Sequence, residues 1–79
     1  MISQPVVGSE WREHIISTPE VLSGKPRIKG TRISVASILG YLAAGSSIPE
    51  IIKEYPDLTS EQIFACLNYA REMVEYKIV

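Results

Sequence analysis

The sequence of 79 residues contains a single cysteine, Cys66, and a single histidine, His14. One thiol cannot form an internal disulfide bond, and a structural zinc site takes about four thiolate or imidazole ligands. The sequence offers no second thiol and no cluster of histidines to bind a metal ion. We therefore expect no metal and no cofactor, and a fold that is stabilised by packing alone.

Long apolar runs are also missing. The longest apolar windows, such as residues 35–44, are interrupted by Ser, Gly and Tyr and fall short of the about 20 residues that a membrane-spanning helix needs. Residues 1–8 have neither a basic start nor an apolar run of signal-peptide length. These absences predict a cytoplasmic protein without a membrane segment. A chain of this length fills one hydrophobic core, so we expect one domain.

The pairs of side chains that catalysis requires are absent as well. No nucleophile stands at a recognisable spacing from a base, and His14, beside two isoleucines, is typical of an exposed residue at a strand end. The stretch SGKPRIKGT departs from the Walker pattern, because a proline follows its first lysine. Cys66 lies between Ile63 and Leu67 without a basic neighbour and is expected to be inert core. The sequence therefore predicts a protein that is not an enzyme.

Acidic residues are missing from the middle third of the chain. Residues 1–20 carry one Arg and three Glu, residues 21–49 carry four cations and no acid, and residues 50–79 carry three cations and six acids. The net charge of −1 hides this asymmetry. A positive segment between two acidic ones bears on the choice of partner rather than on the fold.

The four cations lie within the stretch GKPRIKGTRIS. They are mostly two residues apart, so an extended chain would project the first three from one face, where they could bind phosphates or an acidic protein surface. The alternative is that they are solubilising charges, with Arg27 and Arg32 paired to the acids of residues 50–79. The cations proposed to bind nucleic acid or an acidic partner are Lys25, Arg27, Lys29 and Arg32.

From residue 33 onward, apolar spacing and capping signals predict three helices. The first covers residues 35–44, after the N-cap Ser34; the second follows the capping box of Ser47 and Glu50; and the third begins at Ser60, after Thr59. The third helix is expected to run to about residue 75, with one apolar face toward the core. That face is predicted to consist of Ile63, Leu67, Ala70 and Val74, broadened by Phe64, Cys66 and Met73.

Before residue 33, prolines and glycines forbid a helix and predict extended chain with turns. Short pieces near residues 15–17 and 27–33 could pair as a small hairpin or exchange strands with a second subunit. We expect an N-terminal arm over residues 1–13 and a trihelical domain over residues 14–79, with an extended lead over residues 14–33. The predicted fold class is mainly α: a three-helix, helix-turn-helix bundle with a short extended or β segment at its N-terminus.

The tight connection between the second and third helices is typical of a helix-turn-helix, which favours nucleic acid as a partner. If the third helix reads bases, Gln62 and Asn68 are the candidate readers, because amides can bind adenine edges. Glu61 would face phosphate, and its simpler role is to stabilise the start of the helix. The basic stretch would then supply most of the attraction to DNA.

The three segments GKPRIKGTRISV, GSSIPEII and YPDLTSEQIFACLNYA together resemble the domain-of-unknown-function 433 family, over about residues 14–70. Members of this family are described as VapB-like antitoxins with a homeodomain-like trihelical fold. The resemblance implies a PIN-like ribonuclease toxin, encoded by the neighbouring gene, as the partner that the protein binds and neutralises. It also implies autoregulation through operator DNA.

The segment REMVEYKIV at the end of the chain is a candidate grip for a toxin, and its simpler role is a helix end that packs in a homodimer. The predicted interface residues there are Met73, Val74, Tyr76 and Ile78. The leading hypothesis is therefore an antitoxin, dimeric and able to bind operator DNA. The alternative is a dimeric protein-interaction module that binds no DNA.

Overall fold

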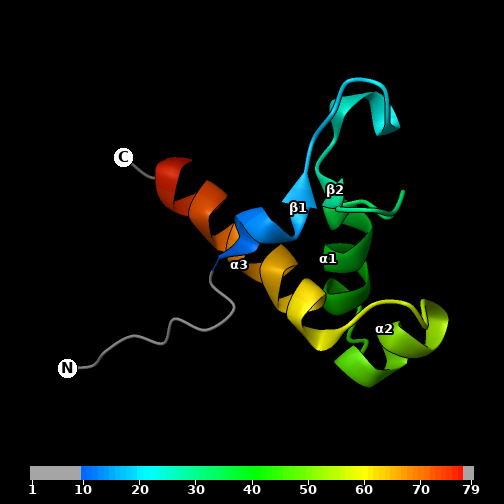
Figure 1. Cartoon of the computed structure of the whole chain (residues 1–79). Helices are drawn as coiled ribbons and strands as arrows, with labels where there is room; N and C mark the ends of the chain where they lie inside the picture. Colours follow the sequence, from blue (N-terminus) through cyan, green and yellow to red (C-terminus); the bar gives the residue numbers. More distant parts are fainter. Residues whose placement is uncertain (1–9, 78–79) are drawn as a thin grey trace.

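The computed structural model describes residues 10–77, and the side chains through residue 75. Three α-helices follow a small antiparallel hairpin (Figure 1). The elements in chain order are the 3-10 turn η1 (Trp11–Glu13), strand β1 (Ile15–Ile16), the turn η2 (Leu22–Gly24), strand β2 (Arg27–Ile28), α1 (Val35–Ala43), α2 (Ile48–Glu54) and α3 (Ser60–Lys77). The predicted fold class is thereby confirmed. Between residues 10 and 77, no helix combines the length and the apolar composition of a membrane span.

The helices begin where the capping residues predict. The backbone N–H of Ser37 donates to Ser34 Oγ at 3.0 Å, which caps α1. At the start of α2, Glu50 N–H donates to Ser47 Oγ at 3.2 Å, and Ser47 N–H donates to Glu50 Oε1 at 2.8 Å. Such reciprocal bonds satisfy N–H groups that have no partner inside the helix, so the starts are fixed by local chemistry.

The hairpin forms within one chain, as the first of the two predicted arrangements. Its strands are antiparallel, with Ile15 opposite Ile28 and Ile16 opposite Arg27. Two residues per strand would not be stable alone in water. Ile15 and Ile28 bury their side chains in the core, which ties the hairpin to the helices.

One core joins the hairpin and all three helices. Its members come from β1, β2, α1, α2, α3 and the segment before α3, so no element folds around a centre of its own. Burying a large aliphatic side chain contributes about 1.5–3 kcal/mol each. The buried residues are Ile15, Ile28, Val35, Ile38, Ile51, Leu58, Ile63, Ala65 and Cys66.

Helix α3 is rotated relative to the sequence prediction. Ile63 and Cys66 are buried as expected, but Phe64, Leu67 and Val74 are exposed, and Ala65, which was not assigned to this face, is fully buried. The expected apolar face was wrong on one side because the prediction considered only contacts with the other helices. The turn η1 also packs on α3, where Trp11 contacts Tyr69. The buried side of the helix therefore includes the side that η1 covers, and Phe64 and Leu67 lie outside it.

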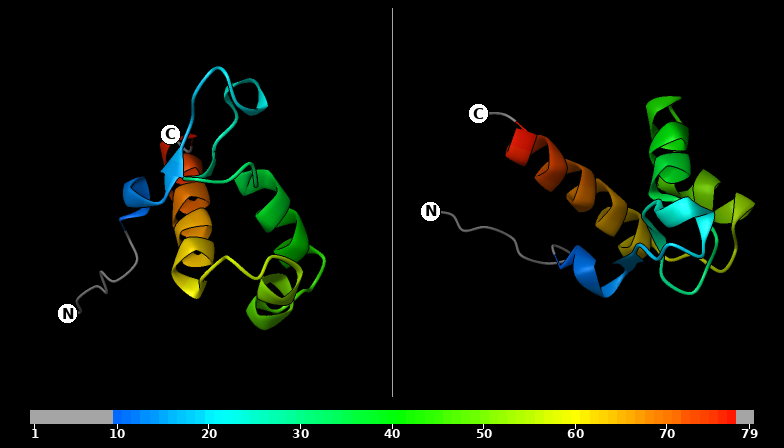
Figure 2. Two further views of the ribbon diagram at one scale, coloured as in Figure 1. Left: turned by 45° about the vertical axis from the view of Figure 1, so that its right-hand side comes forward. Right: turned by 90° about the horizontal axis from the view of Figure 1, so that it is seen from above.

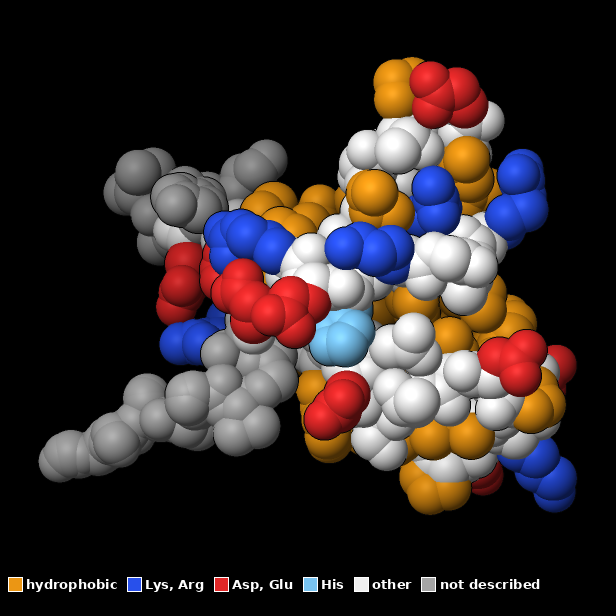
Figure 3. Space-filling model, in the orientation of Figure 1, with side chains coloured by type: hydrophobic (Ala, Val, Ile, Leu, Met, Phe, Trp, Pro, Cys, Tyr) orange, Lys and Arg blue, Asp and Glu red, His pale blue; other side chains and the backbone are white. Residues whose placement is uncertain are grey.

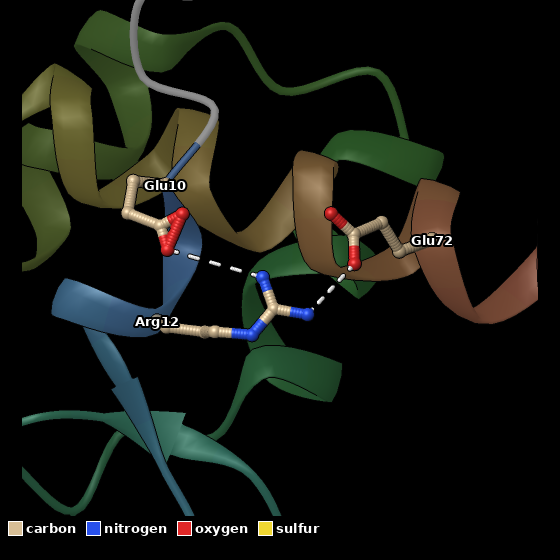
Figure 4. A network of polar contacts seen from close by, with 3 residues as sticks. All are labelled: Glu10, Arg12 and Glu72. Carbon is tan, nitrogen blue, oxygen red and sulfur yellow. Dashed lines mark hydrogen bonds and ion pairs between the residues drawn. The ribbon is translucent and has the colours of Figure 1, made fainter.

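The contact between η1 and α3 combines aromatic and ionic interactions. Trp11 meets Tyr69 edge to face, with ring centroids 4.8 Å apart. The guanidinium of Arg12 lies 4.4 Å from the centroid of the Trp11 ring and donates to Glu72 Oε1 at 3.2 Å (Figure 4). Glu10 lies on the other side of this guanidinium, 3.9 Å away. Residues 10–13, which were assigned to an N-terminal arm, therefore pack on the domain, and residues 1–9 lie outside the described part of the chain.

Candidate functional site

The candidate site is the basic hairpin, by which we mean residues 15–34. It projects from the helical body beside the start of α1 (Figures 1 and 2). Lys and Arg side chains gather over this part of the surface in Figure 3, where acidic atoms also appear at its outer end. The sequence of residues 15–34 has one acid, Glu20, which is exposed. Three of its four cations, Lys25, Lys29 and Arg32, are exposed, whereas Arg27 is half-buried.

Arg27 holds the hairpin together instead of facing a partner. Its Nη1 donates to the Thr31 carbonyl oxygen at 2.9 Å, and its Nη2 donates to Thr18 Oγ1 at 3.2 Å. These bonds link the two arms of the hairpin and the turn after β2. The expectation that Lys25, Arg27 and Lys29 would form one outward row assumed an extended strand, but β2 has only two residues and the Arg27 side chain bonds to the hairpin itself.

The other three cations form no ion pair with the acids whose side chains are described, between residues 10 and 75. Among the described side chains of residues 10–75, the ion pairs join Arg12 to Glu10 and Glu72, and Arg71 to Glu75. The alternative in which Arg32 pairs with the acids of residues 50–79 is therefore not observed in this part of the chain. Lys25, Lys29 and Arg32 keep their donors available to a negatively charged group.

Backbone hydrogen bonds fix the segment that carries Lys29 and Arg32. Lys29 N–H donates to the His14 carbonyl oxygen at 2.8 Å, and Ile28 N–H donates to the Ile33 carbonyl oxygen at 2.9 Å. Between these bonds, Gly30 turns the chain with φ of +81°, a region that side chains with a Cβ rarely adopt. The two cations thus sit on a closed turn whose base is anchored in the core.

The long connection from β1 to β2 contains a strained turn. Leu22 and Ser23 have φ of +53° and +55°, and Gly24 follows with φ of +84°. Left-handed backbone costs a non-glycine residue roughly 1–2 kcal/mol, and such strain gathers at binding sites. A shallow hollow lies beside this turn, next to the Thr18 side chain that Arg27 contacts; it is lined by Ser17, Thr18, Pro19, Ser23 and Gly24. The turn sets the position of Lys25, which comes directly after it.

Helix α3 offers little to a nucleic acid. The Oε1 atom of Gln62 accepts from Thr59 N–H at 2.9 Å, so this oxygen already caps the helix. Asn68 is half-buried, and Glu61 is exposed in the first turn. The exposed face also carries Phe64 and Leu67. Base reading by Gln62 and Asn68 stays a prediction, on a helix whose residues 60–70 include no Lys or Arg.

The proposed grip at the end of α3 is only partly described. Met73 is half-buried, and the Val74 side chain is 56% exposed. The side chain of Tyr76 and the whole of Ile78 lie outside the described parts of the structure. Their assignment to an interface stays a prediction. Sequence reasoning did not include Phe64 and Leu67 among the exposed residues, and their helical spacing alone could not have shown which side of α3 is covered.

Comparisons with known proteins show which family this architecture represents. The family model described as "Protein of unknown function (DUF433)" matches residues 15–70, which include the hairpin and most of the three helices. "Uncharacterized protein y4eO" of Sinorhizobium fredii is 36% identical over 59 residues, which are 75% of this chain and 27% of that protein. The crystal structure of a DUF433 member from Anabaena variabilis is similar, with a TM-score of 0.73 and 35% sequence identity, over 78% of this chain and 61% of that one. This chain thus spans about a quarter of the curated relative and three fifths of the crystallised one. The chain belongs to the DUF433 family of proteins of unknown function.

Proposed function

We propose that this protein is an antitoxin, which binds a PIN-like ribonuclease encoded beside it and blocks that enzyme with the basic hairpin. The observation that carries this proposal is the exposure of Lys25, Lys29 and Arg32 and their availability to bind a negatively charged group. All three are exposed, and none has an acidic partner among the side chains described for residues 10–75. A nuclease active site lined by carboxylates would present the opposite charge, and complementary charges speed and orient association.

The proposed mechanism is occupation of the partner's site rather than catalysis. The hairpin is narrow. Lys25 directly follows the left-handed turn of residues 22–24, and Lys29 and Arg32 lie on the closed turn after β2. That closed turn is tied to the core through Ile28. A preorganised cationic projection loses little conformational entropy when it enters an acidic cleft. The role belongs in the cytoplasm, where the ribonuclease would act.

Operator binding is the second part of the proposal, and the same three cations would serve it. Lysine and arginine on a projecting segment can contact DNA phosphates, which gives affinity without base recognition. The exposed side of α3 favours protein contacts instead, because Phe64 and Leu67 carry no groups that hydrogen-bond base edges. We therefore expect direct sequence readout by α3 to contribute little.

Co-expression with the adjacent open reading frame tests the proposal. We expect a tagged form of this protein to retain the neighbouring protein through purification, and ribonuclease activity to appear only after the two are separated. A gel shift with the promoter fragment then distinguishes an antitoxin that also binds its operator from a module that binds protein alone. Retention of DNA that falls steeply with salt supports autoregulation, and a stable complex without DNA retention supports a module that binds protein alone. If the neighbour neither co-purifies nor is inhibited, the antitoxin proposal is wrong.

A further inference from the structure

The shallow hollow beside the left-handed turn is lined by three residues with hydroxyl groups. Its walls are Ser17, Thr18, Pro19, Ser23 and Gly24, and its volume is about 350 Å³. Ser17 and Ser23 are exposed, and their hydroxyls bond to none of the described residues. The hollow lies on the part of the basic hairpin that projects from the helical body (Figure 1). We call it the hydroxyl hollow.

Thr18 connects the hydroxyl hollow to a positive charge. Its Oγ1 accepts from Arg27 Nη2 at 3.2 Å, and its own hydroxyl proton has no acceptor among the described residues. A hydroxyl that accepts from a guanidinium is polarised, so it donates more strongly to the next acceptor. A negatively charged oxygen in the hollow would therefore complete a chain of hydrogen bonds that begins at Arg27.

The charge of Arg27 is not balanced within the described part of the protein. The residue is half-buried, its Nε is buried without a hydrogen-bond partner, and none of the acids described for residues 10–75 pairs with it. Partial burial of an unpaired charge is costly, and a bound anion would lower this cost. Lys25 adds a second positive charge on the same loop, and the one acid of the hairpin, Glu20, does not line the hollow.

We propose that the hydroxyl hollow binds the terminal phosphate group of a phosphate monoester, through the hydroxyls of Ser17, Thr18 and Ser23. Serine and threonine hydroxyls, together with arginine and lysine, are common donors to phosphate oxygens. A phosphate monoester has three strong acceptor oxygens, one for each hydroxyl, whereas a carboxylate has two. The inference goes beyond the antitoxin role and does not depend on it, because that role does not use these hydroxyl groups.

Titration with inorganic phosphate, followed by the amide NMR signals of the full chain at constant ionic strength, tests the site. We expect saturable shifts concentrated in residues 17–25, and a clearly weaker response of the same residues to acetate. The absence of saturable shifts, or shifts confined to residues 29–32, would overturn the proposal, because charge alone would then attract the ion. Equal affinities for phosphate and acetate would overturn it as well, since the hollow would then suit the carboxylates of a protein.

Removing one hydroxyl at a time tests the three donors. Ser17→Ala and Ser23→Ala should each lower the affinity for inorganic phosphate about tenfold, because a hydrogen bond to a charged group is lost. Both residues are exposed, so both variants should keep the native circular dichroism spectrum. Ser60→Ala is the matched control, because it removes an exposed hydroxyl at the start of α3 and changes no charge. If all three variants bind phosphate as the native chain does, the proposal is wrong.

Two further probes distinguish the sources of a terminal phosphate. One is a short oligonucleotide with a 5′-phosphate, compared with the same strand without it, and the other is ribose 5-phosphate. If the end of a nucleic acid is the source, the 5′-phosphate strengthens binding and Ser23→Ala removes this gain. If a small molecule is the source, ribose 5-phosphate displaces inorganic phosphate and the 5′-phosphate leaves the affinity of the oligonucleotide unchanged. If neither probe displaces inorganic phosphate, the hollow does not bind monoesters and the proposal fails.

Discussion

Replacing Lys25, Lys29 and Arg32 together by alanine is expected to weaken the proposed complex with a ribonuclease by more than 100-fold. A hydrogen bond between charged groups contributes about 1.5–3 kcal/mol to an interface, so the loss of three such contacts removes several kcal/mol. Isothermal titration calorimetry of the purified partners measures the change in Kd. The effect should appear mainly in affinity, because all three side chains are exposed and contribute little to folding.

Lys53→Ala is the control outside the site, and it removes one positive charge where the triple variant removes three. Lys53 is an exposed cation on α2, outside the basic hairpin, so its removal changes the net charge without touching the site. We expect its complex to keep nearly the native Kd. Arg27 is left in place in both variants, because its bonds to Thr18 and Thr31 support the shape of the hairpin. Equal affinities for the native chain and the triple variant would remove the hairpin from the interface.

Replacing Ile28 by alanine is expected to lower the free energy of unfolding by about 2–5 kcal/mol, which is the usual cost of truncating a fully buried isoleucine. Ile28 has no exposed surface and joins β2 to the core. A domain of this size has only a few kcal/mol of stability, so the variant should melt at least about 10 °C below the native chain. Thermal and urea unfolding followed by circular dichroism measure this difference.

Lys29→Ala is the neighbouring control, because Lys29 is exposed and its removal should change stability by about 0.5 kcal/mol or less. If Ile28→Ala cost no more than Lys29→Ala, the hairpin would not be anchored in the core. The three cations would then sit on a loosely held loop, and the preorganisation that the proposed mechanism requires would be missing.

The helix starts could be predicted because the chemistry that sets them is local. Ser34, Ser47 and Thr59 each accept a hydrogen bond from the backbone N–H three residues ahead, and this spacing is visible in the sequence. The hairpin was one of two predicted arrangements for the same reason: prolines and glycines on both sides leave only short extended pieces. Pairing within one chain, rather than between two, could not be inferred from these signals.

The orientation of α3 could not be predicted, because it depends on a contact between residues about 60 positions apart. Arg12 contacts Glu72, and Trp11 contacts Tyr69, so η1 packs on one side of α3. The apolar pattern of α3 alone does not show which side of the helix η1 covers. The role of Arg27 was hidden in the same way. Its spacing matches that of the exposed lysines, and only the positions of Thr18 and Thr31 turn it inward.

The salt dependence of the proposed ribonuclease complex tests the central claim most directly. Screening by added salt weakens attraction between exposed charges, with a Debye length that falls from about 10 Å at 0.1 M to about 3 Å at 1 M. We expect Kd for the native chain to rise steeply with sodium chloride, and the triple variant at Lys25, Lys29 and Arg32 to show a nearly flat response. A native complex whose Kd does not change with salt would contradict the account, because the three free cations would then have no part in binding.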